Sequence, residues 1–300
     1  MNETTLFLTE HQIPFLTDEP MKNHTSFRTG GPAALFASPA TVDQLSALLG
    51  FCSARGVRPL ILGNGSNLLV SDRGIDGLVI SMCELDEVRQ LDDVTFFAAA
   101  GTRLIRLCKA ALAADCTGLE FAYGIPGTVG GAVFMNAGAY GGEMKQVVSF
   151  AEHLTPDGTP GRLTGGELDF GYRHSAYMNN GCIVTGAVVR LETGDHALIE
   201  EKMNDLLGRR KDKQPLEYPS AGSVFKRPEG YFAGALIEQS GLKGRRVGGA
   251  AVSEKHAGFI INVGDATTAD VLNLIDVCRE TVFKNFGVTL ETEVRFVGER

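Results

Sequence analysis

The sequence predicts a protein of mixed helices and strands, long enough for two or three domains. Its 300 residues can bury a substantial hydrophobic core, and a chain of this length usually forms more than one domain. From Thr41 the pattern fits an amphipathic helix with three leucines and Cys52 on one face. A short apolar run, Pro59–Leu62, follows this helix and is typical of a buried strand.

The next elements follow from the same patterns, in order along the chain. Thr41 and Gln44 have the spacing of a capping box at the start of the first helix. Apolar residues at helical spacing predict a second helix over Thr102–Ala114, and Asp157-Gly158 predicts a turn. Short apolar runs predict strands at Leu78–Ser81, Thr95–Ala100, Val147–Leu154 and Ile183–Leu191.

A polar helix of about eighteen residues marks the predicted domain boundary. Asp195 is its expected N-cap, and Gln214-Pro215 ends it. The predicted domains are therefore residues 1–200 and 201–300. In the second domain Gly287 stands where a C-cap glycine belongs. The elements expected there are the helices Phe232–Ser240 and Thr268–Phe286 and the strands Ala257–Val263 and Leu290–Val297.

Composition and charge narrow the classes of function. Hydrophobic residues make up 44% and charged residues 21% of the chain, as in ordinary globular proteins. The net charge is −8 with a pI near 5.3, which argues against a nucleic-acid partner. The N-terminus has no basic region followed by a continuous apolar core, so no signal peptide is expected. Six cysteines without CxxC spacing and six histidines without HExxH favour a cytoplasmic protein with reduced thiols and no metal site. No obligatory protein partner is evident.

A glycine-rich stretch, Gly124–Glu143, contains seven glycines, and no charged residue occurs in Phe121–Gly142. Twenty-two uncharged residues are long enough to cross a bilayer, but the glycines, Pro126 and Asn136 are poor helix material and no Lys or Arg flank marks an orientation. Two interpretations stay open. The stretch is either a tight connection that uses the conformational freedom of glycine, or a loop whose bare backbone directs amide N–H groups at phosphate.

A second glycine-rich motif, GNGSNLL at residues 63–69, directly follows a predicted strand. Nucleotide-binding folds place a phosphate loop at such a position. The dinucleotide fingerprint is not met, because Leu68 stands at its third glycine position, and no GxxxxGK[ST] motif occurs. Together the two stretches suit a diphosphate held between two loops, as FAD requires. The hydroxyl and amide donors that they offer are Ser66, Asn67, Thr128 and Asn136.

Two further segments carry candidate functional side chains. Arg173, within Tyr172-Arg-His-Ser175, fits either a salt bridge or a guanidinium fork for a carboxylate or enolate oxygen. Ser223 follows a small, flexible turn without a GxSxG or triad pattern, so it is either a turn residue or a proton donor rather than a hydrolase nucleophile. The surrounding cations fit either a solvated helix end or an anionic substrate. They are Arg209, Arg210, Lys211, Lys213, Lys226 and Arg227.

The C-terminal segment alternates at period two from Leu290 to Val297. Glu291, Glu293 and Arg295 are expected to share one strand face. That face is either exposed with cross-strand ion pairs, or it mounts a carboxylate for acid–base or electrostatic work.

Six motifs occur in the order found in the UDP-N-acetylenolpyruvoylglucosamine reductase family, and the resemblance covers essentially the whole chain. They are RTGGPA (28–33), LGNGSNLL (62–69), GIPGTVGGAVFMNAGAYGGE (124–143), YRHS (172–175), SAGSVFKRP (220–228) and LETEVRFVG (290–298). The resemblance implies an α+β fold: a vanillyl-alcohol-oxidase-like, PCMH-type FAD-binding domain of two subdomains, with its core at about 27–192, and a C-terminal α+β substrate-binding domain. It also implies a cytoplasmic oxidoreductase of peptidoglycan synthesis, which serves cell-wall biogenesis, cell shape and cell division. In this family NADPH reduces FAD, and the enolpyruvyl ether of UDP-N-acetylglucosamine is then reduced to UDP-N-acetylmuramate. Non-covalent binding of FAD is expected here, because no His or Cys lies in the GNGSN loop.

The resemblance also implies roles for positions of this sequence. The catalytic residues are Arg173, which would stabilise charge on the substrate, Ser223, which would deliver a proton, and Glu293, which would hold the substrate or its proton network. The FAD-binding positions are Gly63, Asn64, Gly65, Ser66, Asn67, Leu68, Pro126, Gly127, Thr128, Gly130, Gly131, Asn136, Gly138 and Ala139. Substrate contacts are expected from Tyr172, Lys213, Lys226 and Arg227.

Two other functions compete with this one. A flavin oxidase or dehydrogenase of the same superfamily, acting on an alcohol or sugar, often attaches FAD through a His or Cys, and residues 63–72 contain neither. An inactive nucleotide-binding protein would have lost one of the three catalytic positions, and all three are present. Only fifty positions separate Arg173 from Ser223, which resembles the short form of the family and leaves open which residue covers the uridine. Some relatives also have Cys where Ser223 stands.

Overall fold

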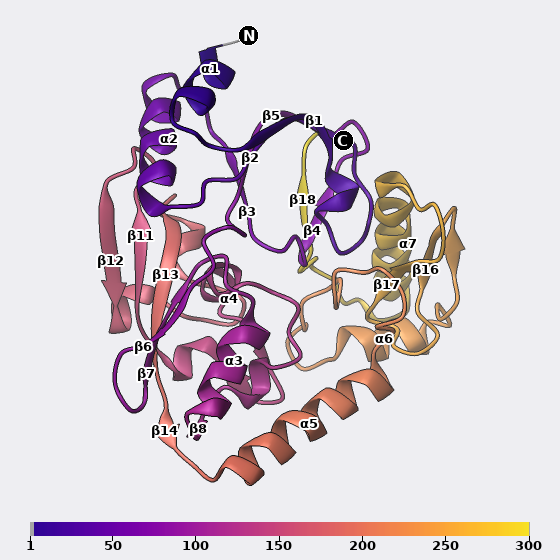
Figure 1. The fold of residues 1–300 in the computed structure, drawn as a ribbon. Coiled ribbons are helices and arrows are strands. Elements are labelled where there is room, and N and C mark those ends of the chain that lie inside the picture. Colours follow the sequence, from indigo (N-terminus) through magenta and orange to yellow (C-terminus); the bar gives the residue numbers. More distant parts are fainter. Residues whose placement is uncertain (1–2, 300) are drawn as a thin grey trace. The chain divides into compact units, whose positions relative to one another are not determined.

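The structure is a computed structural model that describes residues 3–299 (Figure 1). The chain forms two compact units, and neither is continuous in sequence. Unit 1 contains residues up to 17, 35–64 and 77–209; unit 2 contains residues 18–34, 65–76 and 210–299. The predicted boundary near residue 200 lies close to the last crossing between the units. The two earlier segments of unit 2 come from the N-terminal quarter of the chain.

A five-stranded antiparallel sheet is the centre of unit 1 (Figure 1). Its order is β12-β11-β13-β7-β6, with bounds Pro160–Thr164, Val148–Leu154, Ile183–Arg190, Thr95–Ala99 and Val88–Gln90. Ala187 on the central strand β13 is paired with Ala151 on one side and Ala98 on the other. All three alanines are buried, as expected for positions over which other elements pack closely. Three of these strands were predicted from their apolar runs.

The helices of unit 1 largely follow the sequence patterns. In α2 (Val42–Ala54) the predicted apolar face is buried, and Thr41 Oγ1 accepts a hydrogen bond from the Gln44 N–H at 3.1 Å. The expected capping box forms only in part, because the Gln44 side chain accepts from the N–H of Ala40. In α3 (Leu104–Ala113) the four predicted apolar positions are buried. Unit 1 also contains α1 (Glu3–Glu10), α4 (Val129–Met135) and most of α5 (His196–Lys213).

The chain crosses from one unit to the other within three of its strands. A four-stranded sheet has the order β1-β2-β5-β3, with bounds Phe15–Pro20, Pro32–Ala37, Ile75–Ser81 and Leu60–Leu62. Strands β1, β2 and β5 each begin in one unit and end in the other. The shorter elements are strands β8 (Cys116–Thr117), β9 (Gly138–Ala139), β10 (Gly142–Glu143) and β14 (Glu192–Thr193), and 3-10 helices η1 (Met21–Asn23), η2 (Glu120–Ala122), η3 (Met144–Gln146), η4 (Gly165–Leu168) and η5 (Ala176–Met178).

Unit 2 is built around helix α7 (Thr268–Phe286), which has the predicted bounds and ends at Gly287 in a left-handed conformation, φ 68°. It packs against α6 (Ala233–Gln239) and an antiparallel sheet, β15-β16-β17, with bounds Arg246–Val247, Ala250–Val252 and Ile260–Asn262 (Figure 1). Separately, β18 (Arg295–Val297) pairs in parallel with β4 (Leu68–Val70). The last strand of the chain therefore lies beside the strand that follows the GNGSN motif.

Two predicted elements differ from the structure. The glycine-rich stretch is not irregular throughout, because Val129–Met135 form α4 between an N-cap at Thr128 and a left-handed Asn136. Packing outweighs the low helix propensity of glycine here, since α4 lies against β7 and β13. The C-terminal strand is also shorter than predicted: only Arg295–Val297 are regular, because the N–H of Glu293 donates to Val224 O rather than joining a ladder with β4.

Candidate functional site

The first half of the GNGSN motif is joined to the glycine-rich stretch within unit 1. The Asn64 side-chain amide donates to Pro126 O at 2.6 Å. A side chain on Gly63 would place its Cβ 2.6 Å from Thr128 Oγ1, so only glycine fits without a shift. The two motifs thus lie in contact, as two loops that hold one ligand must. In the same stretch Pro126 is exposed, and Gly127 O accepts the N–H of Leu104 at 3.0 Å.

The second half of the motif lies in unit 2 beside residues 24–29. Gly65 has a φ of 60°, and a Cβ there would overlap the carbonyl oxygen of His24. The Gly65 carbonyl accepts the N–H of Ser26 at 3.2 Å. Ser66 follows in the turn, and Leu68 begins β4. The glycine is therefore required by its own backbone conformation as well as by the close approach of the 24–26 backbone.

Two buried hydroxyl groups next to this motif have no partner in the described chain. They are Ser26 Oγ and Thr29 Oγ1. Buried polar groups in native proteins are nearly always hydrogen-bonded, so each orphaned hydroxyl indicates a missing ligand or water. A phosphate or a ribose supplies such partners, and the residues present therefore fit a nucleotide cofactor. Neither residue was predicted as a site residue, although Thr29 belongs to the RTGGPA motif.

The amide groups at the start of α4 are already engaged. The N–H of Val129 donates to Thr102 O at 2.8 Å, and the N–H of Gly130 to Ala100 O at 2.9 Å. The N–H of Gly131 donates to the capping hydroxyl of Thr128 at 3.4 Å. These three amides bind the protein itself. Gly130 and Gly131 can therefore contribute to a cofactor site only by their shape, because the lack of a side chain lets another group approach closely.

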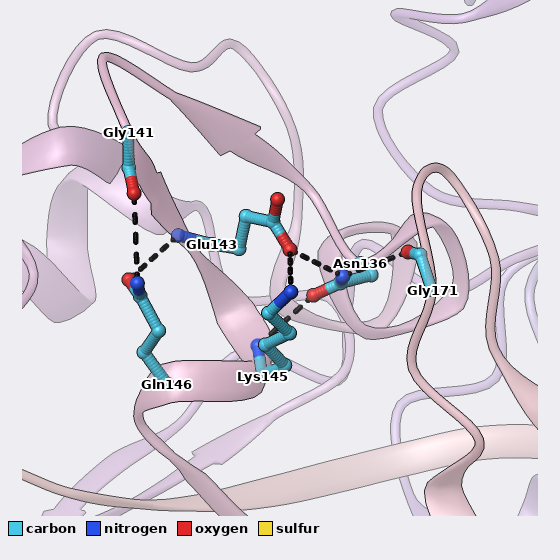
Figure 2. Close-up of polar contacts among 6 residues, drawn as sticks. All are labelled: Asn136, Gly141, Glu143, Lys145, Gln146 and Gly171. Atoms are coloured by element: carbon cyan, nitrogen blue, oxygen red, sulfur yellow. Dashed lines mark hydrogen bonds and ion pairs between the residues drawn. The ribbon is translucent and has the colours of Figure 1, made fainter.

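Asn136 organises the end of the stretch rather than presenting its side chain to solvent (Figure 2). Its amide nitrogen donates to Glu143 Oε2 at 2.9 Å and to Gly171 O at 2.8 Å, and its oxygen accepts the Lys145 N–H at 2.9 Å. The Lys145 ammonium pairs with Glu143 at 2.9 Å. Lys145 holds the pKa of Glu143 below its usual value against the opposing effect of burial, and Asn136 and Arg173 act in the same direction. The carboxylate at this position is therefore ionised.

Arg173 is held beside this network. It has a left-handed φ of 52°, and its Nη2 donates to the Gly138 carbonyl at 3.3 Å. Its guanidinium lies 5.2 Å from the ring centroid of Tyr172, which is 53% exposed. Gly138 and Ala139 form β9, which pairs with β10. Arg173, Tyr172 and Gly138, which were predicted as catalytic, substrate-binding and cofactor-binding positions, are thus adjacent in unit 1. The side chain of Arg173 is only half-buried, so a ligand can reach it.

Ser223 and Glu293 come together in unit 2. The Glu293 N–H donates to Val224 O at 2.7 Å, and Phe225 forms an isolated bridge with Thr292. Both Ser223 and Glu293 are half-buried. The side-chain amide of Asn67 donates to the Glu293 carbonyl at 3.1 Å, so the GNGSN motif reaches the same place. The hydrogen bond from Asn67 to Glu293 joins residues 226 positions apart in the chain.

The predicted basic residues of unit 2 differ in their surroundings. Lys226 pairs with the exposed Glu291 at 3.3 Å. The Arg227 guanidinium lies 4.0 Å from the centroid of the Phe232 ring, which is 61% exposed. Lys213 is exposed in the last turn of α5. Cations at a helix C-terminus complement its dipole, so part of this charge has a structural role.

Within residues 3–299 no group of three or more His, Cys, Asp or Glu side chains is arranged to hold a metal ion. No helix in the same range combines the length and the apolar character that a bilayer span requires.

Comparison with known proteins identifies the family. The UDP-N-acetylenolpyruvoylglucosamine reductase of Clostridium novyi is 52% identical to this chain over 93% of its residues and 91% of the relative. The reductase of Enterococcus faecalis is 49% identical, covering 100% of this chain and 99% of the relative. The chain belongs to the UDP-N-acetylenolpyruvoylglucosamine reductase family. Its members are oxidoreductases, and so is this chain.

Two family models match this reductase. Residues 33–164 match the FAD binding domain, and residues 214–297 match the C-terminal domain of UDP-N-acetylenolpyruvoylglucosamine reductase. The crystal structure of the Thermus caldophilus reductase superposes with a TM-score of 0.80 at 36% identity, over 95% of this chain and 98% of that one. The Physcomitrella patens BBE-like 1 variant D396N superposes with a TM-score of 0.50 at 20% identity, over 64% of this chain and 45% of that one. The fold is therefore the predicted α+β fold with a vanillyl-alcohol-oxidase-like FAD-binding domain.

Proposed function

We propose that this reductase converts the enolpyruvyl ether of UDP-N-acetylglucosamine to UDP-N-acetylmuramate in the cytoplasm, as a step of peptidoglycan precursor synthesis. NADPH is the proposed source of reducing equivalents, and FAD is the cofactor. The observation that carries the proposal is that the backbone of Glu293 makes two hydrogen bonds. Its backbone hydrogen-bonds to the residue after Ser223 and to Asn67 of the GNGSN motif, so the candidate proton donor and carboxylate lie next to a predicted cofactor loop.

The residues present fit FAD. The proposed contacts come from the two joined glycine-rich motifs and from the orphaned hydroxyls of Ser26 and Thr29. We propose that binding is non-covalent, because residues 63–72 contain no His or Cys. The exposed Cys83 thiol does lie 3.5 Å from the Gly63 carbonyl, to which it donates. Release of all flavin on acid precipitation supports the non-covalent form, whereas colour in the pellet that disappears in Cys83→Ser would contradict it.

When bound, FAD would supply the hydride chemistry that links NADPH to the methylene carbon of the enolpyruvyl group. Negative charge then develops on the adjacent carbon and spreads into the substrate carboxylate. Arg173 would stabilise this charge with its guanidinium, an electrostatic contribution commonly worth several kcal/mol. Ser223 would give its hydroxyl proton to the carbanion, and water would restore that proton. An ordinary serine suffices, because the carbanion is much more basic than an alkoxide.

The remaining proposed roles concern binding. Glu293 would orient the substrate or hold the proton network around the reacting carbon. Lys213, Lys226 and Arg227 would contact the diphosphate and the carboxylate, and Tyr172 would line the substrate site beside Arg173. The half-burial of Arg173, Ser223 and Glu293 supports these roles, because partial burial strengthens electrostatic interactions while still admitting a ligand.

Spectroscopy of the purified protein tests the function. We expect a yellow protein with a flavin absorption band, bleached by NADPH in the absence of air and recoloured by the enolpyruvyl substrate. A colourless protein that does not respond to nucleotides would overturn the proposal. Recolouring by oxygen alone, together with bleaching by an alcohol or sugar rather than NADPH, would favour a flavin oxidase or dehydrogenase instead.

A further inference from the structure

A short turn, residues 253–259, lies directly against Ser223. Ser223 forms an isolated antiparallel bridge with Phe259, and the N–H of Val224 donates to Gly258 O at 2.9 Å. The turn is closed on itself, because the N–H of Phe259 donates to His256 O at 2.9 Å. The backbone of Ser223 is therefore held by this turn.

The hydroxyl of Ser223 and the imidazole of His256 both lie close to Gly258. A Cβ built on Gly258 would lie 3.1 Å from Ser223 Oγ, 3.0 Å from His256 Cε1 and 3.2 Å from His256 Nδ1. Gly258 is buried and its φ is not in the left-handed region, so its backbone conformation would suit any residue. Glycine is needed here for space. The hydroxyl and the imidazole both lie next to the place that a side chain at Gly258 would occupy.

The imidazole of His256 is fixed in orientation and protonation. Its Nδ1 accepts the N–H of Gly258 at 3.1 Å, so the ring proton is on Nε2. Burial lowers the pKa of His256, in agreement with a neutral ring. The Phe259 ring meets it edge-on at 4.9 Å. Gly234 of α6 also lies close to the ring, because a Cβ there would be 3.4 Å from His256 Cε1. The ring is thus clamped by the turn and by α6.

We propose that His256 is a positioning residue, which holds Gly258 against Ser223 and so keeps the Ser223 hydroxyl in one rotamer. A serine hydroxyl otherwise samples three staggered positions, and only one can direct its proton at a given carbon. This inference rests on the proposed role of Ser223 as proton donor. His256 takes no proton in the step: the proton leaves Ser223 Oγ for the carbanion, and water replaces it.

Variants at position 256 test the inference by separating the two half-reactions. His256→Ala removes both the acceptor and the ring, whereas His256→Asn keeps an acceptor close to the place of Nδ1. We expect His256→Ala to slow oxidation of the reduced flavin by the enolpyruvyl substrate by about 10- to 100-fold, the effect of a misplaced reacting group. Flavin reduction by NADPH should change less than about twofold, and His256→Asn should recover most of the lost rate.

A second pair of variants tests the contact from the other side. Gly258→Ala forces a methyl group between the hydroxyl and the ring, so it should slow the same half-reaction. Gly208→Ala is the matched control, because a Cβ on Gly208, within α5, would meet nothing within 4 Å. Both half-reactions should be unchanged in this control. If His256→Ala fails to fold, Gly258→Ala and His256→Asn still carry the test.

A structural readout does not depend on turnover. In protein labelled with 13C-histidine, the His256 Cε1–H signal is assigned by its loss in His256→Asn, and it should shift in Ser223→Ala. The inference is overturned in two cases, provided that Ser223→Ala itself is slow. Either the His256 signal does not move in Ser223→Ala, or substrate-dependent oxidation is normal in both His256→Ala and Gly258→Ala. A normal rate in Ser223→Ala would overturn the proposed proton donor instead.

Discussion

Asn67 donates its side-chain amide to the backbone carbonyl of Glu293 at 3.1 Å, and its own carbonyl accepts the N–H of Arg295 at 3.0 Å. One residue of a glycine-rich loop thus binds the backbone on both sides of Val294. The backbone of Glu293 is consequently held by the loop that we propose for the cofactor. We therefore expect cofactor binding at that loop to be coupled to the position of the Glu293 carboxylate.

Asn67→Asp tests this coupling, since the substitution preserves shape but replaces the donor with a second acceptor. We expect the protein without cofactor to lose about 1–3 kcal/mol of stability, the usual effect of an unsatisfied partly buried group. Substrate-dependent flavin oxidation should also slow. Thermal unfolding of the cofactor-free protein and stopped-flow absorbance measure the two effects. Unchanged stability would mean that the hydrogen bond to Glu293 contributes little.

Ser223→Ala is expected to separate the half-reactions. Ser223 has no proposed role in hydride transfer from NADPH, so flavin reduction should remain near normal. Oxidation by the enolpyruvyl substrate should fall by at least about a hundredfold, as expected for loss of a positioned proton donor. Rapid-mixing absorbance follows each step separately. Equal slowing of both steps would make Ser223 a structural or shared-binding residue.

Glu293→Gln retains size and hydrogen bonding but removes the charge. If the carboxylate orders the substrate, turnover should fall at least about a hundredfold with little change in melting temperature. Glu291→Gln is the control two residues away. Glu291 is exposed and pairs with Lys226 at 3.3 Å, an arrangement worth about 0–1 kcal/mol. Equally small effects of the two substitutions on turnover would leave Arg173 and Ser223 to carry the reaction.

Gly130→Ala tests why glycine occupies α4. Its Cβ would lie 2.8 Å from Ala100 Cβ and 3.1 Å from Ala100 O, so α4 would have to move away from the end of β7. Overpacking of this kind costs about 1–3 kcal/mol. The neighbouring Gly131→Ala places its Cβ 3.5 Å from Thr128 Oγ1, an ordinary contact, and should be neutral or stabilising. Denaturant unfolding of the two variants measures the difference, and equal stabilities would contradict the packing explanation.

Local sequence patterns predict the elements whose stability is local. Helix α7 has the predicted bounds because apolar residues recur at helical spacing between Thr267, which caps the first turn, and Gly287, which takes the left-handed conformation at the end. Strands β7, β11 and β13 of unit 1 appear where apolar runs indicate them. The reductase motifs identify the family and the catalytic positions to be tested, because each motif is contiguous in the chain.

Tertiary structure alone decides what depends on contacts between distant segments. Helix α4 forms among residues of low helix propensity because β7 and β13 lie against it. The C-terminal strand is shortened because Glu293 donates to Val224 O, and Asn67 meets Glu293 across more than 200 residues. His256 belongs to none of the sequence motifs, yet its ring lies beside Gly258, as the Ser223 hydroxyl does. The physical reason is that periodicity records which face of an element is buried, whereas the hydrogen-bond partner of an irregular residue is set only when the chain has folded.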